Sequence, residues 1–140
     1  MAIDRKFLGF ALPAFTVTVT PERLADFAAA IGDTDPIESG AIAPPTFMKV
    51  LEGEGNSSRR ILEALGVDLR RVLHEQQFDY VAPIRVGDTV GIERKVADLY
   101  ERKGGLMDFI VIESSFSAPA GTLLGKSRQI VLVRNPAQRS

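Results

Sequence analysis

The sequence contains no cysteine and a single histidine. Without cysteine the chain can form no disulfide, hold no metal through thiolates and use no thiol nucleophile, and we expect it in the reducing cytoplasm. A single histidine also excludes a multi-histidine metal site within one chain. We therefore expect neither a metal ion nor an organic cofactor.

The sequence also lacks an excess of charge and any long apolar run. Lysine and arginine number 17 against 18 acidic residues and are scattered singly or in pairs, so no basic surface for a nucleic acid is predicted. No segment approaches the ~18 apolar residues of a membrane span. The apolar residues 7–15 are interrupted by Gly9 and Pro13, which favours an N-terminal arm over the core rather than a secretory signal. We expect no nucleic acid and no membrane among its partners.

What remains is ordinary globular composition. The chain has 140 residues, of which 45% are hydrophobic and 25% charged. A chain of this length buries roughly two thirds of its surface in one core. We therefore expect residues 1–140 to form a single domain.

The first half of the chain predicts one strand followed by helical pieces. Residues 15–20 alternate between apolar and polar, as a half-buried strand does. Thr20 can cap a helix that begins at Pro21, and Gly32 can end it. The apolar positions at helical spacing are Leu24, Phe27, Ala28 and Ile31 in this helix, then Phe47, Val50 and Leu51, and then Ile61, Leu62 and Leu65 in a piece that Asn56 or Ser57 can cap.

The second half changes to a period of two. Strands are predicted over residues 72–80, 89–100, 106–117 and 123–134, and the intervening Gly and Pro residues predict tight turns between them. Gly104-Gly105 is the strongest hairpin signal. These four strands predict an antiparallel meander, and the separation of helices from strands indicates an α+β fold with a sheet of about five strands wrapped round a helix.

The loop between the first two helical patterns is the most unusual stretch. It reads IGDTDPIESGAIAPPTF and combines the carboxylates Asp33, Asp35 and Glu38 with glycine and proline. Such shaped loops carry function more often than stability. We expect the functional site here.

Four segments together resemble the MaoC-like, (R)-specific hydratase/dehydratase group of hot-dog-fold proteins. They are GDTDPI, APPTF, LHEQQFDYVAPIRVGDTV and DLYERKGG, and the resemblance covers residues 8–135. The chain is most similar to the N-terminal, fatty-acid-synthase-1-like (FAS1-like) dehydratase type within that group. This resemblance implies a strongly curved antiparallel sheet round a central helix, dimerising into a double hot dog.

The resemblance also implies a catalytic motif, G-D-x-[ND]-P-x-H. Its Asp and His hold the water that adds to, or leaves, the β-carbon of an enoyl or 3-hydroxyacyl thioester. Here Asp33 stands at the Asp position, but Glu38 stands where the His is expected. Two carboxylates sharing one water repel each other as anions, so one would need to be protonated, and such a pair could still do acid/base chemistry. Members of the N-terminal type often lack the histidine and form the non-catalytic half of a pair.

Five residues are candidates for the site, each with a simpler alternative. Asp33 is catalytic or a turn residue, and Glu38 replaces the acid/base or, as the sequence favours, is a solvated loop charge. His74 is a substrate contact or, preferentially, a structural histidine bonded to backbone or a partner carboxylate. Thr46 caps the central helix, aiming free N–H groups at a thioester carbonyl or only satisfying the helix end. Phe47 lines an acyl tunnel or, preferentially, packs in the core.

Three functions stay open at this point. The first is a component of a 3-hydroxyacyl-thioester dehydratase of fatty acid metabolism, acting on acyl-CoA or acyl-carrier-protein thioesters. It would be a homodimer or, preferentially, a substrate-binding subunit in a heterodimer with a catalytic MaoC-like subunit. The second is a hot-dog acyl-CoA thioesterase in which Asp33 or Glu38 activates water. The third is an acyl-thioester-binding protein without chemistry.

Overall fold

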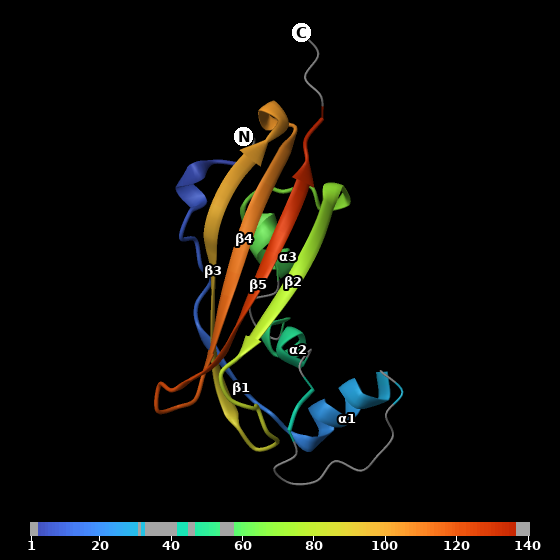
Figure 1. Cartoon of the computed structure of the whole chain (residues 1–140), viewed down its shortest axis with the longest axis vertical. Coiled ribbons are helices and arrows are strands. Elements are labelled where there is room, and N and C mark those ends of the chain that lie inside the picture. The colour runs from blue at the N-terminus through green and yellow to red at the C-terminus, as the bar shows by residue number, and fades with distance from the viewer. Residues whose placement is uncertain (1–2, 31, 33–41, 45–46, 54–57, 137–140) are drawn as a thin grey trace.

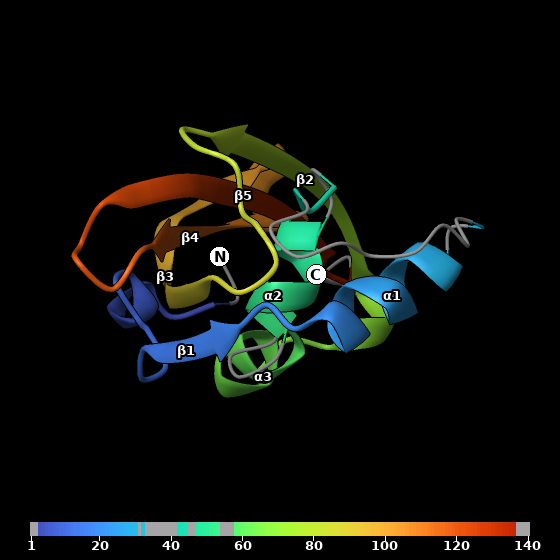
Figure 2. The ribbon, with the colours of Figure 1, turned by 90° about the horizontal axis from the view of Figure 1, so that it is seen from below.

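Five strands form one antiparallel sheet that curls round a helix (Figures 1 and 2). The computed structural model describes residues 3–30, 32, 42–44, 47–53 and 58–136. The sheet has the order β1-β3-β4-β5-β2, and its strands are β1 (Phe15–Thr18), β2 (Val72–Tyr80), β3 (Thr89–Arg102), β4 (Met107–Ser117) and β5 (Leu123–Arg134). The expected curved sheet of about five strands is confirmed.

Three α-helices lie in the first half of the chain. They are α1 (Pro21–Ala30), α2 (Phe47–Gly53) and α3 (Ser58–Ala64), with short 3-10 turns η1 (Arg5–Phe7), η2 (Leu69–Arg71) and η3 (Lys103–Gly105). Thr20 caps α1 as predicted, because its Oγ1 accepts the N–H of Arg23 at 3.2 Å. Gly32 has a φ of 84° after the end of α1, which suits glycine. Ile31, Asn56 and Ser57 lie outside the described residues.

The predicted four-strand meander is wrong in one respect. Only β3, β4 and β5 are joined as neighbours, whereas β2 pairs with β5 at the far edge. Residues 81–88 therefore do not make a tight turn but cross the open end of the curved sheet, with Ile84 buried in the core. The backbone N–H groups of Val81 and Ala82 both donate to the carbonyl of Leu124, at 2.9 and 3.0 Å, and so fix the start of the crossing. Burial of Ile84, together with these backbone hydrogen bonds, outweighs the turn-forming residues of the segment.

The predicted hairpin between β3 and β4 is confirmed. Gly104 and Gly105 have φ values of 64° and 89°, a region that favours glycine, and both lie in η3 between the two strands. At the other end of β3, Gly87 has a φ of 95° and Asp88 accepts the N–H of Arg85 at 2.8 Å. This turn delivers the chain from the crossing segment into β3.

The N-terminal arm follows the edge of β3. The N–H of Gly9 donates to the carbonyl of Val96, and the N–H of Val96 donates to the carbonyl of Phe10, both at 2.8 Å. Phe7, Phe10 and Leu12 pack against the core, as expected of an arm. Across the described residues, no helix has both the length and the apolar character needed to cross a membrane.

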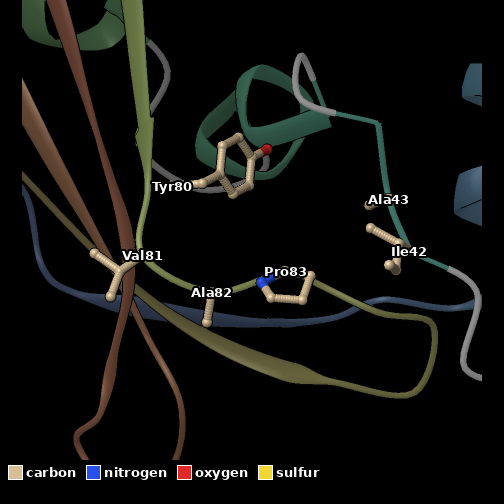
Figure 3. Close-up of a pocket in the computed structure, with 6 residues that line it drawn as sticks. All are labelled: Ile42, Ala43, Tyr80, Val81, Ala82 and Pro83. Carbon is tan, nitrogen blue, oxygen red and sulfur yellow. The ribbon is translucent and has the colours of Figure 1, made fainter.

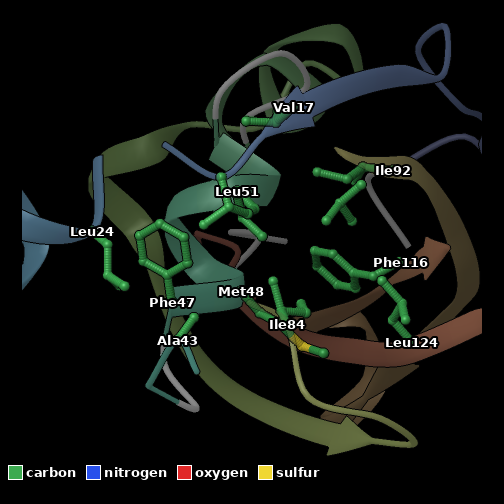
Figure 4. Close-up of a cluster of buried hydrophobic side chains, with 12 residues drawn as sticks. Val17, Leu24, Ala43, Phe47, Met48, Leu51, Ile84, Ile92, Phe116 and Leu124 are labelled. Atoms are coloured by element: carbon green, nitrogen blue, oxygen red, sulfur yellow. The ribbon is translucent and has the colours of Figure 1, made fainter. Parts of the chain in front are cut away.

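Most of the buried apolar side chains fall into two clusters on the concave side of the sheet. The first surrounds α2, which contributes Phe47, Met48 and Leu51 (Figure 4). The second surrounds α3, which contributes Ile61 and Leu62. Polar side chains occupy the inner face of the sheet between these clusters.

Candidate functional site

The structure places only part of the predicted site. Asp33, Glu38 and Thr46 lie outside the described residues, so their roles stay predictions. Phe47 is the first residue of α2 and is fully buried, with its ring edge-on to that of Phe27 at a centroid distance of 5.5 Å. Phe47 is therefore part of the core, and its role in lining an acyl tunnel stays a prediction.

His74 lies well away from Phe47. It stands opposite Val131 on β2, near the second core cluster, and its side chain is exposed. Six residues of extended strand, or about 20 Å, separate it from Tyr80 at the other end of β2. Among the described residues its ring makes no hydrogen bond or ion pair, so a contact with substrate or with another chain stays a prediction.

The cavity next to α2 is the best candidate site among the described residues (Figure 3). It has a volume of about 360 Å³ and lies where the segment before α2 meets the end of β2. Its lining residues are Ile42, Ala43, Tyr80, Val81, Ala82 and Pro83. All of them are apolar except for the phenol oxygen of Tyr80, so the cavity suits a hydrocarbon group.

Backbone hydrogen bonds hold the two walls of the cavity together. The N–H of Ala43 donates to the carbonyl of Ile84 at 2.7 Å, and Ile42 forms an isolated bridge with Arg85. Ile42 and Val81 remain 57% and 69% exposed and form an apolar rim. The two walls of the cavity are thus held together by hydrogen bonds, and its entrance is hydrophobic.

Tyr80 links the cavity to the start of α2. Figure 3 shows its hydroxyl directed towards that helix. Burial raises the pKa of the Tyr80 phenol above its ordinary value, and a hydrogen bond from the backbone of Met48 offsets part of this shift. At neutral pH the phenol is uncharged, and it satisfies a backbone N–H in the first turn of α2.

A buried polar cluster lies further inside the sheet, and sequence reasoning missed it. Glu52 at the end of α2 is fully buried and faces Arg94, which is 1% exposed, with Oε1 and Nη2 3.8 Å apart. The Nε of Arg94 donates to Ser114 Oγ at 2.8 Å, and its Nη2 donates to Ser58 Oγ at 2.9 Å. Arg94 therefore connects β3 both to β4 and to the first residue of α3.

The carboxylate of Glu52 has two further partners. It accepts the hydroxyl of Ser127 at 2.5 Å and lies 3.3 Å from Lys49 Nζ. Burial lowers the pKa of Arg94, and the nearby Glu52 charge counteracts this shift. The available signal was the position of Arg94 on the inner, apolar face of its alternating strand, and of Glu52 beside Met48 and Leu51 at helical spacing.

Neither the cavity nor the buried polar cluster has the composition of a metal centre. Within the part of the chain that the structure describes, no three His, Asp or Glu side chains gather closely enough to hold a metal ion. The described site can therefore bind apolar groups and position them beside one neutral hydroxyl.

Comparison with known proteins shows what this chain resembles. Residues 6–124 match the family described as "FAS1-like, dehydratase domain region". A "UPF0336 protein" of Thermobifida fusca is 33% identical over 151 aligned residues, which cover 98% of this chain and 97% of that protein. A "UPF0336 protein" of Saccharopolyspora erythraea is 27% identical, with coverages of 99% and 96%.

Solved structures have the same fold at low sequence identity. The HadBC (3R-hydroxyacyl-ACP dehydratase) complex from Mycobacterium tuberculosis matches with a TM-score of 0.73 at 18% identity, over 94% of this chain and 99% of that chain. A MaoC-like dehydratase from Phytophthora capsici also matches with a TM-score of 0.73 at 18% identity, over 99% of this chain and 51% of that chain. The ChsH1–ChsH2 complex from M. tuberculosis matches with a TM-score of 0.68 at 18% identity, over 93% of this chain and 87% of that chain. The expected hot-dog fold is confirmed.

Proposed function

Because the chain belongs to the FAS1-like dehydratase family, we propose that it is the acyl-thioester-binding subunit of an (R)-specific 3-hydroxyacyl-thioester dehydratase. In that reaction a base removes a proton from the α-carbon, and the β-hydroxyl leaves with a proton from an acid, so that water and an enoyl thioester result. A second, MaoC-like subunit supplies the histidine for these proton transfers. The reverse reaction is hydration of the enoyl thioester.

The apolar cavity beside α2 is the observation that carries this proposal. Its lining has no charged group, so it fits the hydrocarbon part of an acyl chain rather than a polar metabolite. The neutral phenol of Tyr80 is tied to the backbone of Met48 and is therefore not free to act as a strong base. The cavity binds and orients, and the described residues around it offer no acid/base pair.

The sequence of the loop before α2 supports a binding role for this chain and a catalytic role for its partner. Glu38 replaces the histidine that the family motif requires, while Asp33 is retained. An imidazole titrates near neutral pH, whereas a carboxylate next to Asp33 must be protonated before it can donate. The chain alone is therefore expected to be a poor catalyst of hydration.

The free edge of β2 supports a partner subunit. In the described sheet β2 is hydrogen-bonded only to β5, so its other edge offers unpaired backbone groups to a strand of another chain. Pairing with a second hot-dog chain would extend the sheet and form a double hot dog. The HadBC and ChsH1–ChsH2 structures are themselves complexes. We propose a catalytic MaoC-like subunit as this partner in preference to a second copy, with an acyl-CoA or acyl-carrier-protein thioester as substrate.

A reconstitution assay tests the proposal. The purified chain, a histidine-bearing MaoC-like protein and their mixture are each given crotonyl-type thioesters, and the loss of the enoyl group and the release of free thiol are followed. We expect the mixture to hydrate the substrate at least ten times faster than the sum of the two separate rates. Purely additive rates would contradict the accessory role, and release of thiol by the chain alone would favour a thioesterase.

A charge at the rim of the cavity tests the binding site directly. Ile42→Asp places a carboxylate at a 57% exposed position, so we expect the fold to survive but acyl-thioester binding to weaken at least tenfold, or by about 1.4 kcal/mol. Leu106→Asp is the matched control, since Leu106 is 41% exposed but lies beyond η3 at the far end of the sheet. Calorimetric titration with a non-hydrolysable acyl-CoA analogue measures both variants. Equal affinities for the two variants would remove the cavity from the site.

A further inference from the structure

The two central strands carry apolar residues on both faces. Residues 109–112 and 130–133 are each four consecutive apolar residues, in β4 and β5 respectively. Continuous apolar runs are typical of strands that are covered on both sides. Here α2 and α3 cover the concave face only, and neither view places a described helix over the outer face of these strands (Figures 1 and 2).

The register of the sheet brings the outward apolar residues together. Tyr100 stands opposite Phe109, Phe109 opposite Leu132, and Leu132 opposite Leu73, so one row crosses four strands. The next row contains Val111 opposite Ile130, and Val111 is already fully covered by its neighbours in the same chain. We refer to the five residues of these rows that keep some exposure as the outer stripe: Leu73, Tyr100, Phe109, Ile130 and Leu132.

The outer stripe presents a firm surface. The rings of Tyr100 and Phe109 are stacked, with centroids 4.8 Å apart and an interplanar angle of 7°. The guanidinium of Arg102 lies over the Tyr100 ring at 4.7 Å, and Leu73 at the other end of the row is 55% exposed. Rigid aromatic and aliphatic surface of this kind is common in protein interfaces.

Charged residues border the stripe with opposite signs on its two sides. The row of Val111 ends in Asp98 on β3 and in Glu75 on β2. On the other side of the Leu132 row, Met107 is flanked by Arg102 on β3 and Arg134 on β5. One border is therefore acidic and the other basic.

We propose that the outer stripe packs against the same stripe of a second copy of this chain, with the two sheets back to back and their strands running in opposite directions. A two-fold axis that runs along the Leu132 row, perpendicular to the strands, produces this arrangement. Two aligned sheets packed in this way lie about 10 Å apart. The axis places Leu132 over its own counterpart and brings Arg102 of each copy over Asp98 of the other.

The opposite choice of axis is disfavoured by charge. A two-fold axis parallel to the strands would place Asp98 of one copy over Glu75 of the other, and like charges at an interface are repulsive. The charges at the borders of the stripe thus select one orientation. This contact uses the outer face and leaves the free edge of β2 available, so it is independent of the proposed acyl-binding function.

The mass of the protein in solution tests this contact. Sedimentation velocity or light scattering on the purified chain should give twice the mass of the Leu132→Glu variant at the same micromolar concentration, whether or not the β2 edges also pair. Lys126→Glu is the control, since Lys126 lies on the same face of β5 but about 20 Å from Leu132, and it should keep the larger mass. Equal masses for the wild type and Leu132→Glu would overturn the proposal.

A charge exchange tests the orientation and does not require a charge to be placed within the apolar stripe. Arg102→Asp and Asp98→Arg should each weaken self-association at least tenfold, and the double variant should restore it to within about threefold of the wild type. Circular dichroism confirms that each variant is folded. Failure of the double variant to recover would reject the orientation, and a larger mass found only with another protein bound would assign the stripe to a different partner and overturn the proposal.

Discussion

Gly125 lies on β5 directly against the side chain of Met48 from α2 and the backbone of β2. A Cβ atom at this position would collide with the Cε methyl of Met48 and stand 2.7 Å from the carbonyl oxygen of Asp79. The side chain of Met48 can move, but the backbone of the paired strand β2 cannot. The glycine is required here by space, and not by a positive φ.

Gly125→Ala should therefore destabilise the protein by about 1–3 kcal/mol, the range for overpacked cores. Gly91→Ala is the matched control because it is also within a strand, and its nearest atom would be the carbonyl oxygen of Ser117 at an ordinary 3.6 Å. Urea unfolding of the two variants measures the difference. Equal stabilities would show that the sheet yields at Gly125.

Glu52 is the residue whose charge matters most to the buried polar cluster. Glu52→Gln leaves Arg94 buried without a counter-charge, and breaking a buried pair in this way costs about 3–5 kcal/mol. Glu63→Gln serves as the control, since Glu63 pairs with Arg59 at 3.0 Å on the surface, where such pairs contribute about 0–1 kcal/mol. Thermal and urea unfolding report both. Similar losses in the two variants would mean that water reaches Arg94.

Tyr80 should make stability depend on pH in the alkaline range. Burial raises its pKa above the ordinary value of 10.0, so the phenol ionises in the unfolded chain at a lower pH than in the folded protein. Between these two pKa values the unfolded state binds fewer protons, and stability falls as the pH rises.

Wild-type protein should therefore lose stability relative to Tyr80→Phe as the pH rises above about 10, the ordinary pKa of tyrosine, and show no such relative loss near neutral pH. Urea midpoints measured across this range give the difference. Tyr100→Phe, which removes the other tyrosine of the chain, controls for the loss of a phenol elsewhere. Parallel pH profiles for wild type and Tyr80→Phe would contradict the buried, protonated phenol.

At the scale of elements, the crossing segment 81–88 both closes the core and walls the cavity. Ile84 within it is 1% exposed and packs in the cluster round α2, while the bridged Ile42 across from it is 57% exposed. Ile84 thus anchors the crossing segment in the core, whereas Ile42 lies on the segment before α2 and forms part of the rim of the cavity.

Ile84→Ala should destabilise the protein by about 2–5 kcal/mol, since it leaves a cavity in the core. Ile42→Ala should change stability by less than about 1 kcal/mol and weaken acyl binding instead. Chemical unfolding and ligand titration on the same two samples distinguish these effects. A reversed pattern would mean that the crossing segment is not anchored by Ile84.

At the scale of the whole molecule, the sequence predicts the elements better than their arrangement. The strands follow from alternation, because half-buried strands need one apolar face, and only their ends differ by one or two residues in most cases. The position of β2 at the far edge could not be predicted, since it depends on burial of Ile84 and on contacts of Val81 and Ala82 with Leu124. Local turn chemistry in PIRVGD contains no information about these tertiary contacts.

The candidate site was predicted less completely. Phe47 is a core residue, while the cavity depends on Tyr80, which the motif contains but which no local pattern distinguishes from other strand residues. Glu52 and Arg94 were missed because charged side chains are seldom buried unless they are paired, and their pairing is visible only once α2 lies on the sheet.

The pairing of β2 with β5 also sets the order of events when the chain is made. Val72 pairs with Val133, so the ribosome must add about fifty residues after β2 before its partner strand exists, which takes roughly 3–10 s at ordinary rates of synthesis. During this interval β2 has an unsatisfied backbone on both sides. Its sequence, VLHEQQFDY, is polar at most positions, and this composition protects the waiting strand from pairing with other nascent chains.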